Sequence, residues 1–204
     1  GRFGLNTSLS GWYNWPRESY ADFYRESYSD AQRLNPPTIL DQRTDGQSNF
    51  YGPRASVGAF YDINAYNSIN SSLTFRGFGR NNDGATNSFF GDPTDAVEDQ
   101  IYSRTNESRS LRSGFDWTTD YRRTFKQPEK ELSFAIQISG DLSTSRNEVL
   151  QSGNFAFLGQ DQVNENDGLN VEYTFQTDFA QPLSKAVKLE TGAKAVIRRI
   201  DSDF

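Results

Sequence analysis

The amino-acid sequence predicts an all-β fold in which about seven antiparallel strands follow one another in up-and-down order. Two observations favour this fold. Apolar and polar residues alternate along seven segments of the chain, as they do along strands with two different faces. The segments between them are long and short in strict turn, which indicates hairpins with different connections at the two ends of one sheet.

The alternation is clearest in residues 131–141, where Leu132, Phe134, Ile136 and Ile138 are separated by polar or small residues. Successive side chains of a strand point to opposite faces, so this pattern gives one apolar and one polar face. In chain order, the seven predicted strands are residues 3–13, 57–63, 69–77, 111–121, 131–141, 169–179 and 187–197.

The lengths of strands and connections favour a membrane barrel. Most of the segments have the roughly 9–11 residues that a tilted membrane strand needs, whereas strands of soluble proteins are mostly about 5–6 residues long. Long loops on one side and short turns on the other are typical of outer-membrane barrels. We therefore predict an antiparallel up-and-down transmembrane β-barrel segment. The predicted long loops are 16–48, 81–108 and 144–167, and the short turns are 64–67, 123–130 and 181–185.

Aromatic residues near the predicted strand ends support a membrane position, because aromatic girdles lie at both interfaces of such barrels. A soluble aromatic-rich β-sandwich that binds carbohydrate also has alternating strands and stays open as an alternative. The girdle candidates are Tyr13, Trp15, Phe50 and Tyr51 on the long-loop side, and Tyr61, Tyr66, Tyr121, Phe125 and Phe179 on the short-turn side.

Composition excludes several kinds of chemistry. The chain has no Cys, His or Met, so catalysis by a thiolate or an imidazole and zinc or haem ligation by those groups are excluded. The net charge of −6 argues against nucleic acid as a partner. The acidic segment 81–99 lacks the spacing of a calcium-binding EF-hand loop. We expect no enzyme activity, no cofactor and no bound metal.

Charged residues at the polar positions of the strands are expected to line the barrel lumen. The pair Asp116 and Asp120 shares one strand face, as the acid and base of a glycosidase would, but a polar lumen explains it without catalysis. The other expected lumen residues are Arg112, Glu172, Asp178, Lys188, Glu190 and Lys194.

The first predicted loop contains a short repeat, Arg17-Glu18-Ser19-Tyr20 and Arg25-Glu26-Ser27-Tyr28, with Phe23 and Tyr24 between the two copies. Aromatic rings beside arginine bind cations and the flat faces of ligands. We predict an extracellular ligand-gathering loop. A loop that only packs over the barrel mouth is the alternative. The candidate ligand-binding residues are Arg17, Tyr20, Phe23, Tyr24, Arg25 and Tyr28.

Two stretches, YRRTFKQPEKELSF at 121–134 and GLNVEYTFQTDFAQPLSKAVKLETG at 168–192, resemble the large outer-membrane β-barrel proteins of the Bacteroidota, of the TonB-dependent receptor type. The resemblance covers the last part of the chain well. It implies a barrel of about 22 strands, plugged by an N-terminal domain, that imports a scarce nutrient such as a siderophore, oligosaccharide or peptide. The implied partners are outer-membrane lipid, the plug domain, TonB and the nutrient.

Residues 1–204 contain no recognisable plug domain or TonB box. Seven is also an odd number, whereas bacterial single-chain barrels have even strand counts. We expect residues 1–204 to be a partial barrel domain, with a missed eighth strand within 36–40 as the alternative. A passive porin or an assembly or secretion barrel remains the alternative function.

Overall fold

The computed structural model describes residues 2–29, 31–33, 35–92, 95–154, 159–184 and 186–203, and for residues 95–98 it describes the backbone alone. Seven strands form one sheet in chain order, and all neighbours are antiparallel. This confirms the predicted all-β, up-and-down fold. The strands are β1 (Phe3–Ser27), β2 (Thr38–Asn64), β3 (Asn67–Asp92), β4 (Asp95–Thr124), β5 (Glu131–Gly153), β6 (Gln160–Pro182) and β7 (Lys188–Asp203).

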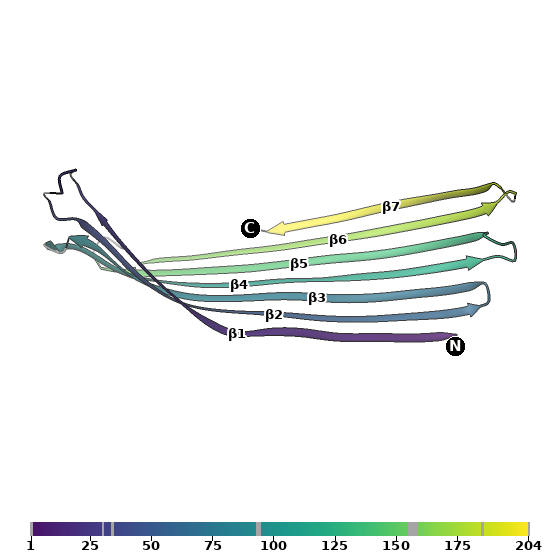
Figure 1. The fold of residues 1–204 in the computed structure, drawn as a ribbon, viewed down its shortest axis with the longest axis horizontal. Coiled ribbons are helices and arrows are strands. Elements are labelled where there is room, and N and C mark those ends of the chain that lie inside the picture. Colours follow the sequence, from purple (N-terminus) through teal and green to yellow (C-terminus); the bar gives the residue numbers. More distant parts are fainter. Residues whose placement is uncertain are drawn as a thin grey trace.

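The seven predicted segments fall one in each strand, apart from Val187, which immediately precedes β7. An eighth strand within 36–40 is wrong, because residues 38–40 are the first residues of β2. Figure 1 shows the strands side by side, with the three short turns and the N-terminal end of β1 at one end of the sheet. The C-terminal end of β7 points the other way, as expected for an odd number of strands.

The three predicted long loops are wrong, because most of their residues continue the flanking strands as paired hairpins. Ladder pairs join Ser19 to Gly46 and Asn82 to Ser108, and Thr144 pairs directly with Asp167. The strands are accordingly 16–30 residues long, beyond the predicted length. We call residues 16–48, 81–109 and 144–167 the extension, and the rest of the sheet the spanning half.

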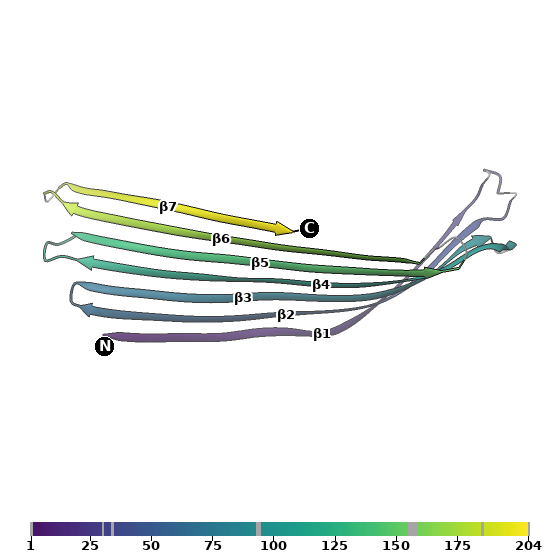
Figure 2. The ribbon, with the colours of Figure 1, turned by 180° about the vertical axis from the view of Figure 1, so that it is seen from behind.

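The two views of the ribbon show how the extension differs in shape. The spanning half is a gently curved sheet, and the far ends of β1 and β2 bend away from it in both views (Figure 1 and Figure 2). The bend on β1 coincides with a β-bulge, at which the register shifts between Asn14 and Arg17. Bulges bend the strand that carries them and increase its twist.

The spanning half has two chemically different faces. Residues that pair directly across antiparallel strands share a face, so the register assigns every paired side chain to one side of the sheet. We call the side with Phe134, Ile136, Phe175 and Leu189 the outer face. The opposite side is the inner face, and it carries the lumen residues that the sequence predicted: Arg112, Asp116, Asp120, Glu172, Asp178, Lys188, Glu190 and Lys194.

The outer face is not covered by any other part of the described chain. Phe134 is 46% exposed, Phe175 is 43% exposed and Leu189 is 49% exposed, and Val149 is the only buried hydrophobic residue among the described side chains. A β-sandwich would bury these side chains between two sheets. The soluble β-sandwich alternative is therefore wrong, because all seven strands form one sheet whose apolar face is open.

Local contacts explain the short turns. In the turn between β2 and β3, the Asn64 side-chain oxygen accepts hydrogen bonds from the Tyr66 backbone N–H at 2.9 Å and from the Asn67 amide at 2.7 Å. Asparagine side chains commonly stabilise turns in this way. Between β4 and β5, Glu129 has a positive φ of 61° that reverses the chain. Among the described residues, no helix is long and apolar enough to cross a membrane.

Candidate functional site

The bulge in β1 decides where the sequence-predicted ligand residues lie. Before it, Asn14 pairs with Phe50, and after it, Arg17 pairs with Ser48, so β1 has one extra residue. The extra residue reverses the odd–even pattern of β1. Arg17 therefore lies on the inner face, together with Phe23 and Arg25.

Tyr20 and Tyr24 lie on the outer face, since they pair with Asp45 and Asp41. Tyr28 follows the end of β1. The six predicted residues thus belong to a strand and its end rather than to a loop, and the structure does not gather them on one surface. Three lie on the inner face, two lie on the outer face, and one lies beyond the strand.

The tyrosines are engaged with carboxylates. The Tyr20 hydroxyl donates a hydrogen bond to Glu18 at 2.7 Å, and the hydroxyls of Tyr24 and Tyr28 donate to the two oxygens of Glu26, each at 2.9 Å. Hydrogen bonding to the carboxylates raises the pKa of all three phenols, and the hydrogen bonds from Tyr28 and Tyr24 lower the pKa of Glu26. These contacts stabilise the outer surface of the extension.

A different group of aromatic residues meets on the inner face, at the junction between the spanning half and the extension. The ring centroids of Trp12 and Phe78 are 6.0 Å apart, and those of Phe50 and Phe78 are 6.3 Å apart. Rings at 4.5–7 Å attract one another through their quadrupoles as well as by contact. Trp12 is 50% exposed and Phe78 is 39% exposed, so both rings are accessible from the inner side.

Gly52 allows the Trp12 ring to lie against the sheet. It pairs with Trp12, and a Cβ atom at position 52 would lie 2.5 Å from the indole nitrogen. Any other residue there would push the ring away from the sheet. Phe50, predicted as part of an interface girdle, is instead part of this inner-face group, because it pairs with Arg80 across β2 and β3.

Arginines surround the three rings. Phe78 pairs directly with Arg112, and Arg80 lies over the Phe50 ring with its guanidinium carbon 5.2 Å from the centroid. Arg54 is a diagonal neighbour of Trp12 across β1 and β2, and Arg17 is a diagonal neighbour of Phe50 across the same two strands. We call these seven side chains the inner-face cluster: Trp12, Arg17, Phe50, Arg54, Phe78, Arg80 and Arg112.

Between the cluster and the short turns, ion pairs join neighbouring strands on the inner face of the spanning half. Arg76 bridges three strands, because its guanidinium contacts Asp116 on β4 and Asp141 on β5, the latter at 2.9 Å. Arg198 on β7 pairs with Glu172 on β6 in the same way. Groups of three or more potential metal ligands are absent from the described residues.

The arrangement defines a class of protein. Seven consecutive strands with an open apolar face and a polar inner face form a segment of the wall of a transmembrane β-barrel. Residues 123–204, which include β5, β6 and β7, match the family model described as outer membrane protein beta-barrel family. The chain is therefore located in the bacterial outer membrane.

Solved structures show weaker similarity. The ferripyoverdine receptor of the outer membrane of Pseudomonas aeruginosa, bound to ferripyoverdine, aligns with 8% identity and a TM-score of 0.31 over 98% of this chain and 38% of its own. The complex of FpvAI with pyocin S2 aligns with 7% identity and a TM-score of 0.31 over 95% of this chain and 37% of its own. The chain thus spans less than two fifths of either structure. A search of the curated proteins finds no match.

Proposed function

We propose that this sheet is part of the wall of an outer-membrane transporter of the TonB-dependent receptor type, which takes up a scarce nutrient through its lumen. The observation that carries the proposal is the inner-face cluster. Its exposed aromatic rings and arginines lie on the face opposite the apolar one, and hence on the lumen side. The lining of a water-filled channel is polar, whereas this face also presents aromatic rings to a ligand.

The resemblance of residues 121–134 and 168–192 to this receptor type in the Bacteroidota adds support. In such a transporter, the short turns face the periplasm and the extension faces the outside. A ligand would then meet the inner face of the extension first, where Phe23 and Arg25 lie, and would reach the inner-face cluster next. The plug domain and TonB would act through the parent protein.

Uptake by cells that carry the full-length protein tests this proposal. Three labelled nutrients cover the expected classes: the iron-55 complex of the cells' own siderophore, a maltooligosaccharide and a tripeptide. We expect accumulation of one of them to fall at least about tenfold when a protonophore collapses the proton-motive force. Uptake that the protonophore does not reduce would indicate a passive porin instead. If this protein supports the uptake of none of the three nutrients, an assembly or secretion barrel would be favoured.

Variants locate the site within the same assay. Trp12→Ala removes a ring of the inner-face cluster, and Trp15→Ala is its matched control, because Trp15 is 80% exposed and contacts the outer-face Tyr13. We expect W12A to reduce energised uptake and W15A to leave it at the wild-type level, at equal abundance in the membrane. Equal uptake by both variants would exclude the cluster as the site.

The prediction that Tyr20, Tyr24 and Tyr28 also bind ligand is tested with the triple alanine variant. Since these hydroxyls are bound to Glu18 and Glu26 and the first two rings lie on the outer face, a loss of uptake would mean that the ligand also contacts the outside of the wall. Unchanged uptake would restrict binding to the inner face.

A further inference from the structure

The charges of the extension are divided between its two faces. Its outer face carries many acidic side chains and three arginines, Arg43, Arg109 and Arg146. The acidic residues of this face include Glu18, Asp22, Glu26, Asp41, Asp45, Asp83, Glu107, Glu148, Asp161, Glu165 and Asp167.

The inner face has the opposite character. Arg17 and Arg25 of β1 and Arg104 of β4 lie on it in the extension, further from the short turns than Arg80 and Arg112. From the pair Trp12–Gly52 outward to the pair Phe90–Gln100, the paired and described side chains of the inner face include no Asp or Glu. The charged side chains that the structure describes on this part of the inner face are therefore all positive.

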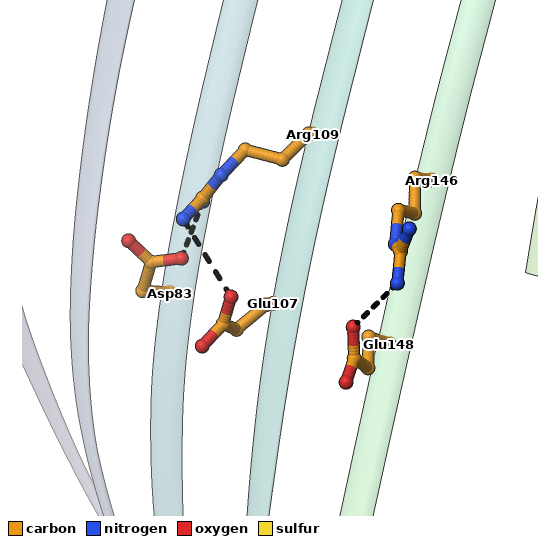
Figure 3. Close-up of polar contacts among 5 residues, drawn as sticks. All are labelled: Asp83, Glu107, Arg109, Arg146 and Glu148. Atoms are coloured by element: carbon orange, nitrogen blue, oxygen red, sulfur yellow. Dashed lines mark hydrogen bonds and ion pairs between the residues drawn. The ribbon is translucent and has the colours of Figure 1, made fainter. Parts of the chain in front are cut away.

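Two of the three outer-face arginines of the extension have carboxylate partners. On the outer face, Arg109 contacts Asp83 and Glu107, and Arg146 contacts Glu148 at 3.1 Å (Figure 3) and Glu165 at 3.0 Å. On the inner face, the described residues offer no carboxylate partner to Arg17, Arg25, Arg54, Arg80, Arg104 or Arg112.

We propose that the inner-face cluster binds an organic anion with a flat apolar surface; this inference rests on the transport function proposed above and names the chemical class of its ligand. Arg80 and Arg112 are diagonal neighbours across β3 and β4, which places their Cα atoms about 7–8 Å apart. Two long arginine side chains whose Cα atoms have that separation can bind two carboxylate, sulfonate or phosphate groups of one small molecule, and Arg binds such groups with paired hydrogen bonds.

The rings provide the second half of the recognition. Trp12, Phe50 and Phe78 form a continuous apolar surface between the arginines, and that surface stacks on a planar ligand. A cationic ligand would be repelled by the arginines, and a neutral sugar would gain hydrogen bonds from them but no charge pairing. The acidic side chains of the extension named above lie on the opposite face of the sheet and so do not compete with a ligand for these arginines.

Binding of pyrene probes to the purified full-length protein in detergent tests the proposal. The probes share one flat ring system: the anion 8-hydroxypyrene-1,3,6-trisulfonate, the cation trimethyl(pyren-1-ylmethyl)ammonium and neutral 1-pyrenemethanol. By fluorescence anisotropy, we expect the trisulfonate to bind most tightly and its affinity to fall as salt is added. Equal or tighter binding of the cationic probe would overturn the proposal.

Charge variants place the binding on the inner face. The double variant R80Q/R112Q should bind the trisulfonate about tenfold more weakly, because two charge-assisted contacts are lost and partly replaced by water. R80K/R112K, which keeps the charges but not the paired hydrogen bonds, should recover part of the affinity. R43Q/R146Q removes the same net charge from the outer face and should bind as the wild type does. Equal affinity of R80Q/R112Q and wild type would contradict the assignment.

The two proposals fail in different ways. If uptake depends on the proton-motive force but the trisulfonate does not prefer the wild-type inner face, the transport function stands and the anionic ligand class is wrong. If the trisulfonate binds as expected but no uptake depends on energy, the cluster is an anion site in a passive channel or another barrel.

Discussion

The spanning half and the extension belong to the same seven strands but are specified in different ways. In the spanning half, the outer face is mostly apolar and the inner face mostly polar, so a shift of register by one residue would turn apolar side chains into the lumen. In the extension, most side chains on both faces are polar, and the backbone ladder continues without that constraint. Apolar alternation therefore fixes the position of a strand in the membrane, whereas the backbone ladder alone fixes how far the strand extends beyond it.

The sharpest test of this difference uses one strand and one face. Ile136 and Leu150 are both on β5 and both on the outer face, 40% and 52% exposed. Ile136 lies in the spanning half and Leu150 in the extension. A charged arginine on the lipid face of a barrel costs about 2–4 kcal/mol near the bilayer midplane and about 0–1 kcal/mol toward the interface.

We therefore expect Ile136→Arg to lower the free energy of unfolding by about 2–4 kcal/mol and Leu150→Arg to lower it by less than about 1 kcal/mol. Denaturant unfolding of the full-length protein in lipid vesicles, followed by tryptophan fluorescence, measures both. Equal effects of the two substitutions would mean that the boundary between lipid and water does not lie between these positions.

The fold of the spanning half could be predicted because its signal is local. The outer face of β5 can be identified within that strand from Leu132, Phe134, Ile136 and Ile138. The inner face of β4 can likewise be identified from Asp116 and Asp120. The paired hairpins of the extension could not be predicted, because segments such as 144–153 and 160–167 are mostly polar and do not alternate, as is typical of loops.

The candidate site was missed for a related reason. Trp12, Phe50 and Phe78 are far apart in the chain, and only the register brings them together. A signal was present, since Trp12 and Phe78 occupy polar positions of otherwise alternating strands. The predicted group from Arg17 to Tyr28 was divided because the bulge in β1 reverses its pattern. Pro16 lies in this bulge and was a sequence signal for it, because proline within a sheet is found at bulges and edges.

The spanning half and the extension each contain an arginine that contacts two carboxylates. Arg76 in the spanning half contacts Asp116 and Asp141, and Arg109 in the extension contacts Asp83 and Glu107 (Figure 3). Exposed ion pairs contribute about 0–1 kcal/mol each and are screened by salt, whereas enclosure in a barrel lumen reduces the screening.

We expect Arg76→Gln to lower the free energy of unfolding by about 1–2 kcal/mol, largely independently of salt, because it leaves two carboxylates unpaired on the inner face. Arg109→Gln should cost less than about 1 kcal/mol, and the difference should vanish near about 0.5 M salt. The same unfolding assay at low and high salt measures both losses and their salt dependence. A salt-independent loss in R109Q would show that the outer face of the extension is also enclosed.

The smallest effect is expected from the tyrosine–glutamate contacts of the extension. The hydroxyls of Tyr24 and Tyr28 donate to Glu26, which raises the pKa of both phenols, and a raised pKa contributes stability below the ordinary phenol value that is lost as pH rises through the folded value. Glu26→Gln removes the negative charge, so both phenols should titrate at lower pH, as seen by tyrosinate absorbance in an alkaline titration. Glu18→Gln, which acts on Tyr20 alone, should move a single phenol and serves as the internal comparison. Superimposable titrations of E26Q and the wild type would mean that these hydroxyls contact water rather than the carboxylate, and that the backbone ladder holds this end of β1 without them.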